Sequence, residues 1–327
     1  MNQTLQELCD LQIKNEAIVR NASFLEDGEL IKIGALFHTT KNQQADEEKI
    51  CRCKDILKSK TGVFSNFRGM LEFAIRAKIS VAPDPEKYLD RIIEIYDKLK
   101  EGRKLPGEIL VLAAITICDQ ANGKDVDAVI AEVKEAYARI KAKHKFLTSE
   151  NDMTFIALMV LSGKDVDQTV EEVETIYLAL RDRFRIPSDT AQAVALILAM
   201  SEKPVDEKVD DFLALYADLK AVKHATSKQR AMSVYAAFAD LDISQDMLVK
   251  DISAVEDFLR RQKGYGLISS SDVRHVMAAT LVLQNYGTQS TSYASSAVSS
   301  VIAEEVILTL IMIIIITTNV NFVVINS

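Results

Sequence analysis

The sequence contains no tryptophan and is poor in residues that break helices or cross-link small folds. Its 327 residues include five prolines, eleven glycines and four cysteines, and aromatic residues make up 6% of the chain. Few prolines and glycines leave long stretches without helix breakers or tight turns. With 48% hydrophobic and 26% charged residues, the composition is typical of a globular, helix-rich protein and argues against extended disorder.

The four cysteines, Cys9, Cys51, Cys53 and Cys118, form neither a disulfide framework nor a CxxC pair. The Cys51-Arg52-Cys53 spacing suits zinc poorly without further ligands. The N-terminal MNQTLQELCDL has acidic residues where a signal peptide has a basic region, and it has no early apolar run. We therefore expect reduced thiols and a cytoplasmic protein.

Motifs of nucleotide binding and of hydrolysis are also missing. The sequence has no GxGxxG, no GxxxxGK[ST], no GxSxG and no HExxH. Its four histidines, His38, His144, His224 and His275, lie far apart, and we interpret them as solvated loop residues. The sequence predicts no catalytic residue, no metal ligand and no cofactor, and it favours a protein that is not an enzyme.

A helix-loop-helix unit is clearest from Asn122 to Leu161 and is nearly repeated over residues 162–200. The first helix, which we call A, has apolar residues at helical spacing from Val126 to Ile140, with Asp125 or a neighbour as its N-cap. The second helix, called B, runs through Phe155–Leu161 with almost no polar face, so it must be covered on several sides.

Six copies of this unit align on the end of the A helix. The aligned segments are KDILK from Lys54, YDKLK from Tyr96, YARIK from Tyr137, YLALR from Tyr177, YADLK from Tyr216 and EDFLR from Glu256. A single hairpin of about 40 residues buries too little apolar surface to offset the entropy of ordering it. The copies must therefore pack on one another.

We predict an all-α fold in which antiparallel helical hairpins of about 40 residues stack as an α-superhelix, a HEAT-like α-solenoid. The predicted single repeat domain covers residues 1–284, with a degenerate first hairpin in 1–40 and six repeats in 41–284. A Ser/Thr-rich linker follows at 285–300, and an apolar tail at 301–327.

Three interpretations of the tail remain open: a membrane-spanning helix, a segment that docks on the repeats or on a second copy of the chain, or an ending produced by an altered reading frame. Docking is favoured because the B helices present more apolar surface than a two-layer array covers. A spanning helix is less favoured, because Thr317, Asn319 and Asn321 interrupt the apolar run and no Lys or Arg follows Arg274.

Three segments, TGVFSNFRG (61–69), LTSENDMTFIALMVLSGKDVD (147–167) and RRQKGYGL (260–267), occur in this order along the chain. With them the sequence resembles a bacterial family known as domain of unknown function 4003, over roughly residues 1–284. The resemblance implies a bacterial, cytoplasmic, helical protein and supplies no catalytic residues. The tail is unlike what the family leads us to expect.

Charge is segregated along the A helices. They begin acidic and end basic, and the cations that end the six aligned segments are Lys58, Lys100, Lys141, Arg181, Lys220 and Arg260. This pattern indicates either compensation of the helix dipoles or a row of cations that binds an anionic partner. With a formal charge of −8, the chain has no overall attraction to phosphate backbones, so nucleic acid is a disfavoured partner.

Two A-to-B loops depart from the repeat pattern and supply the remaining contact candidates, although an aromatic ring tucked under an ordinary turn is the alternative interpretation. The candidate contact residues are Phe64, Phe67, Arg68, Lys100, Lys141, Arg181, Lys220, Arg260, Lys263 and Tyr265. We predict a non-enzymatic repeat scaffold that binds another macromolecule, with protein as the favoured partner class. The alternative is an apolar-ligand-binding protein or enzyme whose pocket is formed by the B layer. The sequence does not indicate an oligomeric state.

Overall fold

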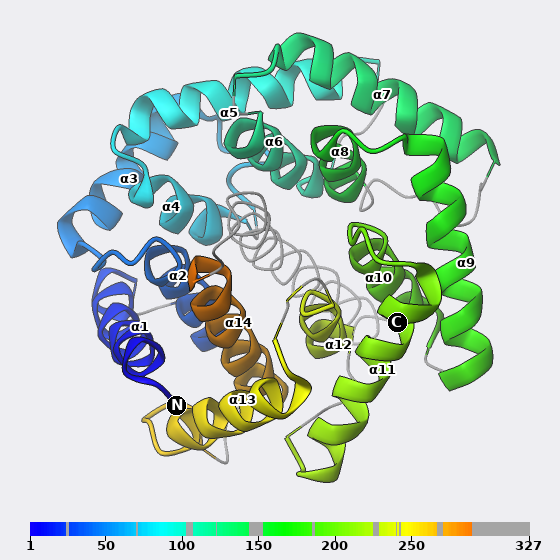
Figure 1. The fold of residues 1–327 in the computed structure, drawn as a ribbon. Coiled ribbons are helices and arrows are strands. Elements are labelled where there is room, and N and C mark those ends of the chain that lie inside the picture. The colour runs from blue at the N-terminus through cyan, green and yellow to red at the C-terminus, as the bar shows by residue number, and fades with distance from the viewer. Residues whose placement is uncertain are drawn as a thin grey trace, which may run out of the picture. The chain divides into compact units, whose positions relative to one another are not determined.

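The computed structural model describes residues 1–23, 26–69, 71–102, 107–121, 123–143, 153–184, 187–224, 229–239, 241, 243–266 and 271–289. Across these ranges the chain forms fourteen α-helices and no β-strand, which confirms the predicted all-α class. Longer helices alternate with shorter ones along the chain from α1 to α13 (Figure 1).

Each predicted A or B segment corresponds to one helix. The A helices are α1 (Gln3–Ala22), α3 (Glu47–Lys60), α5 (Pro85–Lys100), α7 (Val126–Lys143), α9 (Val166–Phe184), α11 (Val205–Ala221) and α13 (Gln245–Arg260). The B helices are α2 (Gly28–Thr39), α4 (Glu72–Val81), α6 (Ile109–Gln120), α8 (Met153–Ser162), α10 (Ser188–Leu198), α12 (Gln229–Ala236) and α14 (Ser271–Gln289).

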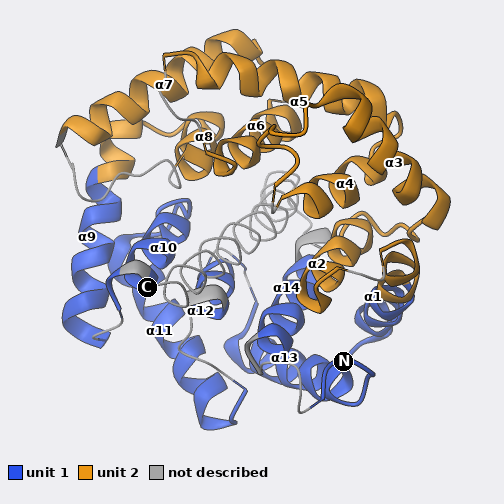
Figure 2. Ribbon diagram, turned by 180° about the vertical axis from the view of Figure 1, so that it is seen from behind, with its two compact units in different colours: residues 1–14, 171–306 blue, residues 15–170, 307–327 orange. Residues whose placement is uncertain are grey.

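The described chain divides into two compact units (Figure 2). One comprises residues 15–170, and the other joins residues 1–14 to residues 171–289. The boundaries predicted from the sequence for a single repeat domain stay a prediction.

Both units follow the same contact pattern. In the unit of residues 15–170, α3 contacts α5 and α5 contacts α7, while α2 packs on α4 and α6 packs on α8. In the other unit, α11 contacts α13, and the B helices α10, α12 and α14 pack in sequence order. Helices also contact their neighbours along the chain, as in α5 with α6 and α13 with α14. Within a unit, A helices therefore contact A helices and B helices contact B helices.

The B helices α6 and α8 are deeply buried in the unit of residues 15–170. In α6 every residue from Leu110 to Ile117 is buried, and in α8 the residues from Met153 to Ala157 are buried. Each fully buried Leu, Ile or Phe contributes about 1.5–3 kcal/mol relative to an exposed one. The prediction that the B helix needs cover on several sides is confirmed for these two helices.

The A helices bury one stripe and expose the other. The fourth residue of the aligned segments has 0% exposure at Leu57, Leu99, Leu180, Leu219 and Leu259. Aspartates stand at the start of several A helices. The Asp84 carboxylate, for example, accepts a hydrogen bond from the Lys87 amide at 3.1 Å and caps α5.

At its C-terminal end α14 continues to Gln289, so the first part of the predicted linker is helical. The helix is held there by Tyr286, whose hydroxyl donates to Asp251 Oδ2 at 2.6 Å. The rest of the linker and the apolar tail, residues 301–327, lie outside the described residues, and so do the three interpretations of the tail. None of the helices in the described ranges is long and apolar enough to cross a bilayer.

Replacing Leu99 by Ala tests the buried stripe. Leu99 has 0% exposure in α5, so Leu99→Ala is expected to lower the free energy of unfolding by about 2–5 kcal/mol. The same change at Leu178, which is 55% exposed on α9, is the matched control and is expected to stay within about 0.5 kcal/mol. Urea denaturation followed by circular dichroism measures both, and equal losses would contradict this assignment of the core.

Candidate functional site

The loop between α3 and α4, residues 61–69, is fixed to the next A helix. Asn66 Nδ2 donates a hydrogen bond to the Tyr96 hydroxyl oxygen on α5 at 2.7 Å. The Phe67 ring is 2% exposed and packs edge-on against the Tyr96 ring, with centroids 5.1 Å apart. Within the loop, the Ser65 amide donates to the Gly62 carbonyl oxygen at 3.0 Å. These contacts give the loop a defined shape.

The same loop presents two apolar side chains to solvent. Phe64 is 102% exposed and Val63 is 73% exposed. An open hollow of about 710 Å³ lies beside them, and its lining residues are Gly62, Val63, Phe64, Ser65, Asn66, Tyr96, Lys100 and Glu101. A fixed loop that exposes a whole phenylalanine ring has the character of a contact site.

The other two candidates in this loop do not reach solvent in the same way. Phe67 lies under the loop, as the alternative interpretation of an aromatic tucked beneath a turn has it. The Arg68 Nε atom lies 3.6 Å from Glu72 Oε2, and the Arg68 side chain is 18% exposed. Of the three candidate residues in this loop, Phe64 is therefore the one whose side chain is fully exposed.

The second aromatic loop, which follows α13 and is described up to residue 266, also buries an aromatic side chain. Tyr265 has 0% exposure, and its carbonyl oxygen accepts a hydrogen bond from Arg274 Nη1 at 2.9 Å. Lys263 is exposed, and Gly264 adopts a φ of 89°, which suits glycine. Tyr265 thus supports the loop from inside.

Four cations in the second half of an A helix are paired with acids on the following A helix. The pairs are Lys60 with Asp90 at 2.6 Å, Lys98 with Asp127 at 2.6 Å, Arg139 with Asp167 at 3.2 Å, and Arg183 with Asp210. All of these side chains are partly exposed, so each pair contributes about 0–1 kcal/mol. The alternation of charge supports dipole and ion-pair compensation over a continuous cationic row.

The candidate cations themselves have varied surroundings. Lys100 Nζ lies 2.6 Å from Asp97 Oδ1 and 5.3 Å from the centroid of the Tyr96 ring. Its hydrogen bond to Asp97 raises the pKa of the Lys100 amine. Lys141 Nζ lies 5.4 Å from the Tyr137 ring centroid. Arg181 and Lys220 are exposed on α9 and α11.

Pairs of aspartates at helix starts are used in capping and ion pairing. Asp125 accepts from the Asp127 amide at 3.0 Å, and Asp165 accepts from the Gln168 amide at 2.8 Å. Lys203 Nζ lies 2.7 Å from Asp211 Oδ2. Over the part of the chain that the structure describes, no group of three or more His, Cys, Asp and Glu side chains is arranged to hold a metal ion.

A buried carboxylate cluster was missed by the sequence analysis. Glu256 on α13 has 0% exposure, and its Oε2 atom lies 2.6 Å from His224 Nδ1 and 2.8 Å from His275 Nδ1. Its Oε1 atom lies 3.5 Å from Arg260 Nη2 and 3.7 Å from Arg274 Nε. One carboxylate therefore links α13 to α14 and to the segment that follows α11.

The pKa of Glu256 follows from these neighbours. Burial acts to raise the pKa of the Glu256 carboxyl, but the contacts with His275 and His224 outweigh it and hold the pKa below the ordinary value of 4.5. The carboxylate is therefore charged in the folded protein at neutral pH.

The interpretation of the histidines as solvated loop residues is wrong for those the structure describes. His38 and His275 are 3% and 5% exposed, and the His224 side chain is 13% exposed. Burial lowers the pKa of His38 to about 4, and its Nε2 atom lies 3.1 Å from Ser80 Oγ. His144 lies outside the described residues. Each of these three imidazoles has a polar neighbour, as polar groups inside proteins usually do.

The repeat pattern contained a signal for this cluster. Glu256 stands at the first position of its aligned segment, where four other copies have Tyr96, Tyr137, Tyr177 and Tyr216. The tyrosine at this position in α5 receives Asn66 from the preceding A-to-B loop, whereas Glu256 receives His224 from its own preceding loop. The two sites use the same place in the repeat with different chemistry.

The four cysteines carry free thiols. Burial raises the pKa of Cys9 and Cys118 to about 12 and that of Cys53 to about 11. These three thiols are protonated at neutral pH and are poor nucleophiles.

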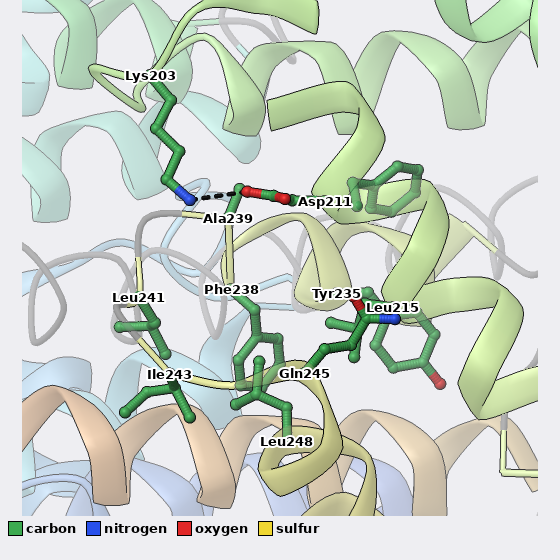
Figure 3. A pocket seen from close by; sticks show the side chains of 11 residues that line it. Lys203, Asp211, Leu215, Tyr235, Phe238, Ala239, Leu241, Ile243, Gln245 and Leu248 are labelled. Atoms are coloured by element: carbon green, nitrogen blue, oxygen red, sulfur yellow. Dashed lines mark hydrogen bonds and ion pairs between the residues drawn. The ribbon is translucent and has the colours of Figure 1, made fainter. Parts of the chain in front are cut away.

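A pocket of about 370 Å³ lies among α11, the end of α12 and the start of α13 (Figure 3). Most of its lining residues are apolar or aromatic, including Phe212, Leu215, Tyr235, Phe238 and Leu248, but polar groups provide more of its exposed surface than apolar groups do. The ion pair between Lys203 and Asp211 lies on one side of it. The pocket involves two A helices, whereas the alternative function predicted a pocket within the B layer.

A family model described as "Protein of unknown function (DUF4003)" matches residues 16–319 of the sequence. The chain belongs to this family. The match confirms the resemblance seen in the three segments, but it extends beyond residue 284 to residue 319 and so includes the predicted linker and part of the tail. The family carries no assigned activity. No curated protein sequence and no solved structure matches the chain. A function for this DUF4003 protein can therefore be proposed only from its own side chains.

Truncating the two phenylalanines of the loop separates support from contact. Phe67→Ala is expected to lower the free energy of unfolding by about 3–5 kcal/mol, because it empties the space under the loop. Phe64→Ala removes a phenyl ring that is exposed to solvent, so it is expected to change the free energy of unfolding by less than about 0.5 kcal/mol. Urea denaturation of the two variants measures the contrast, and similar losses would refute the assigned roles.

Glu256→Gln is expected to destabilise the protein by about 3 kcal/mol at neutral pH, because it removes the buried charge that lies against two histidines and two arginines. Asp257→Asn, at a neighbouring side chain that is 51% exposed, is the control and is expected to change little. Because the folded-state pKa of Glu256 is lowered, its stabilisation is complete above pH 4.5 and is lost as pH falls through the folded-state value. The stability gap between wild type and Glu256→Gln should therefore narrow in acid. A gap that widens would refute this assignment.

Proposed function

We propose that this protein is a non-enzymatic helical-repeat scaffold that binds another protein through the loop carrying Val63 and Phe64. The observation that carries the proposal is the complete exposure of Phe64 on a loop whose neighbours Asn66 and Phe67 are fixed to Tyr96. A soluble chain gains nothing for its own stability from an exposed ring, and aromatic residues dominate the energetics of protein interfaces.

The fixed backbone strengthens this reasoning. A side chain on a rigid loop loses less conformational entropy on binding than one on a mobile segment. The turn hydrogen bonds and the buried Phe67 order the loop before any partner arrives. The partly exposed Lys100 and Glu101 beside the hollow supply a polar rim to an apolar centre, as in many protein interfaces.

For the architecture, we propose the HEAT-like stack of hairpins as an α-superhelix. Contacts of A helices with A helices and of B helices with B helices inside each unit support it. We also place the scaffold in the bacterial cytoplasm in this proposal, with the four free thiols as support.

Binding of an apolar ligand is the second candidate function. The many apolar and aromatic residues that line the pocket in Figure 3 favour it, because a space of about 370 Å³ accommodates a small molecule. The two charged residues that line this pocket, Lys203 and Asp211, are paired with each other, so the second candidate is a binding role.

A photo-crosslinking amino acid at position 63 tests the main proposal, with the same group at position 178 as a control on another exposed apolar site. In extracts of the source cell we expect a discrete adduct from position 63 that is lost when Phe64 is changed to Asp. With the captured protein purified, Phe64→Ala should weaken binding by about tenfold or more, whereas Leu178→Ala should not. Equal affinity of wild type and Phe64→Ala would overturn the proposal.

A further inference from the structure

We propose that the loop of residues 61–69 binds a second copy of this chain, with the two copies related by a two-fold axis beside Phe64. The inference rests on the proposed function, because it names the partner for the same contact site. Three features of the described residues point to this occupant: a projecting ring next to a hollow, an open glycine in that hollow, and a rim of paired opposite charges.

The projection and the hollow are neighbours on one surface. Phe64 is 102% exposed, and it borders the open hollow of about 710 Å³ that extends to Tyr96 and Glu101. In a two-fold interface the same patch is used on both copies, so it must be complementary to itself. A ring beside a hollow satisfies this condition. Two-fold rotation brings Phe64 of the second copy over the hollow of the first copy, and Phe64 of the first copy over the hollow of the second.

The hollow has room for an incoming side chain. A Cβ atom added to Gly62, which lines the hollow, would meet no heavy atom within 4 Å. On the far side, the Tyr96 ring is held by Asn66 and Phe67, so this wall is fixed. Tyr96 is 6% exposed, so an entering ring would meet only a small part of this fixed wall.

The rim of the hollow carries a cation and an anion side by side. Lys100 and Glu101 are consecutive residues, so two-fold rotation can set Lys100 of each copy against Glu101 of the other. Their present contacts are exposed and weak: Lys100 lies 2.6 Å from Asp97, and Glu101 lies 3.4 Å from Lys134. Exchange of these contacts for ones between copies would therefore cost little. A rim of one sign would instead repel its own copy.

Sedimentation velocity of the purified full-length protein tests the inference over micromolar to submillimolar concentrations. Wild type is expected to show a reversible monomer–dimer equilibrium. Phe64→Ala should raise the dimer dissociation constant by about tenfold or more, and Gly62→Leu should do the same by filling the hollow. Leu178→Ala, at an exposed apolar residue elsewhere, should leave the constant unchanged.

The charged rim gives a reversible test. Lys100→Glu and Glu101→Lys should each weaken the dimer, and the double variant should restore it, because the swap keeps opposite charges facing each other. Circular dichroism melting checks that every variant is folded. A wild type that stays monomeric throughout, or a dimer indifferent to Phe64→Ala and Gly62→Leu, would overturn the inference.

These results also separate the inference from the proposed function. If wild type is monomeric but a different protein binds in a Phe64-dependent way, the proposed function stands and the self-association is refuted. If the dimer forms through Phe64, both are supported. If Phe64→Ala changes neither self-association nor binding to a purified captured protein, both are refuted.

Discussion

The rest of the structure depends on covering helices that have no polar face. In α6 and α8 nearly every side chain is apolar and buried, so neither helix can face water on any side. Neighbouring B helices cover part of this surface, and amphipathic A helices cover another part. The A helices then carry most of the charged residues that lie in helices, because their outward stripe meets solvent.

Charge on that outward stripe links successive A helices. Lys98 near the end of α5 meets Asp127 at the start of α7, and Arg139 of α7 meets Asp167 of α9. Exposed pairs of this kind contribute little to stability, but they penalise a register in which like charges would face each other. The apolar layer supplies the free energy, whereas the charged stripe helps to select one register.

Much of the fold could be predicted because helical periodicity encodes burial directly. The stripe that contains Leu57 and Leu99 is visible as a repeating pattern, and so are the aspartates that begin the A helices. Loop residues have no such period. Phe64 and Phe67 lie three residues apart in one loop, yet one is wholly exposed and the other buried. The difference depends on Tyr96, which lies on the following helix.

The histidines show the same limit. His224 and His275 are 51 positions apart, and only the fold brings both to the Glu256 carboxylate. A polar residue in an aligned apolar or aromatic position was the one visible indication of this cluster. Contacts that depend on three separate elements leave no spacing that a single sequence can reveal.

Tyr96 and Glu256 occupy the same aligned position in two different copies, and this difference has a consequence for any change in the number of copies. A neutral hydroxyl accepts an amide from its loop at the first site, and a carboxylate meets an imidazole at the second. Two A helices, α5 and α13, are thus each matched to the A-to-B loop before them. Duplication or deletion of a whole repeat would join a loop to the wrong helix and leave a buried polar group without its counterpart. Adding or removing a helical pair next to α5 or α13 is therefore not expected to be a neutral change.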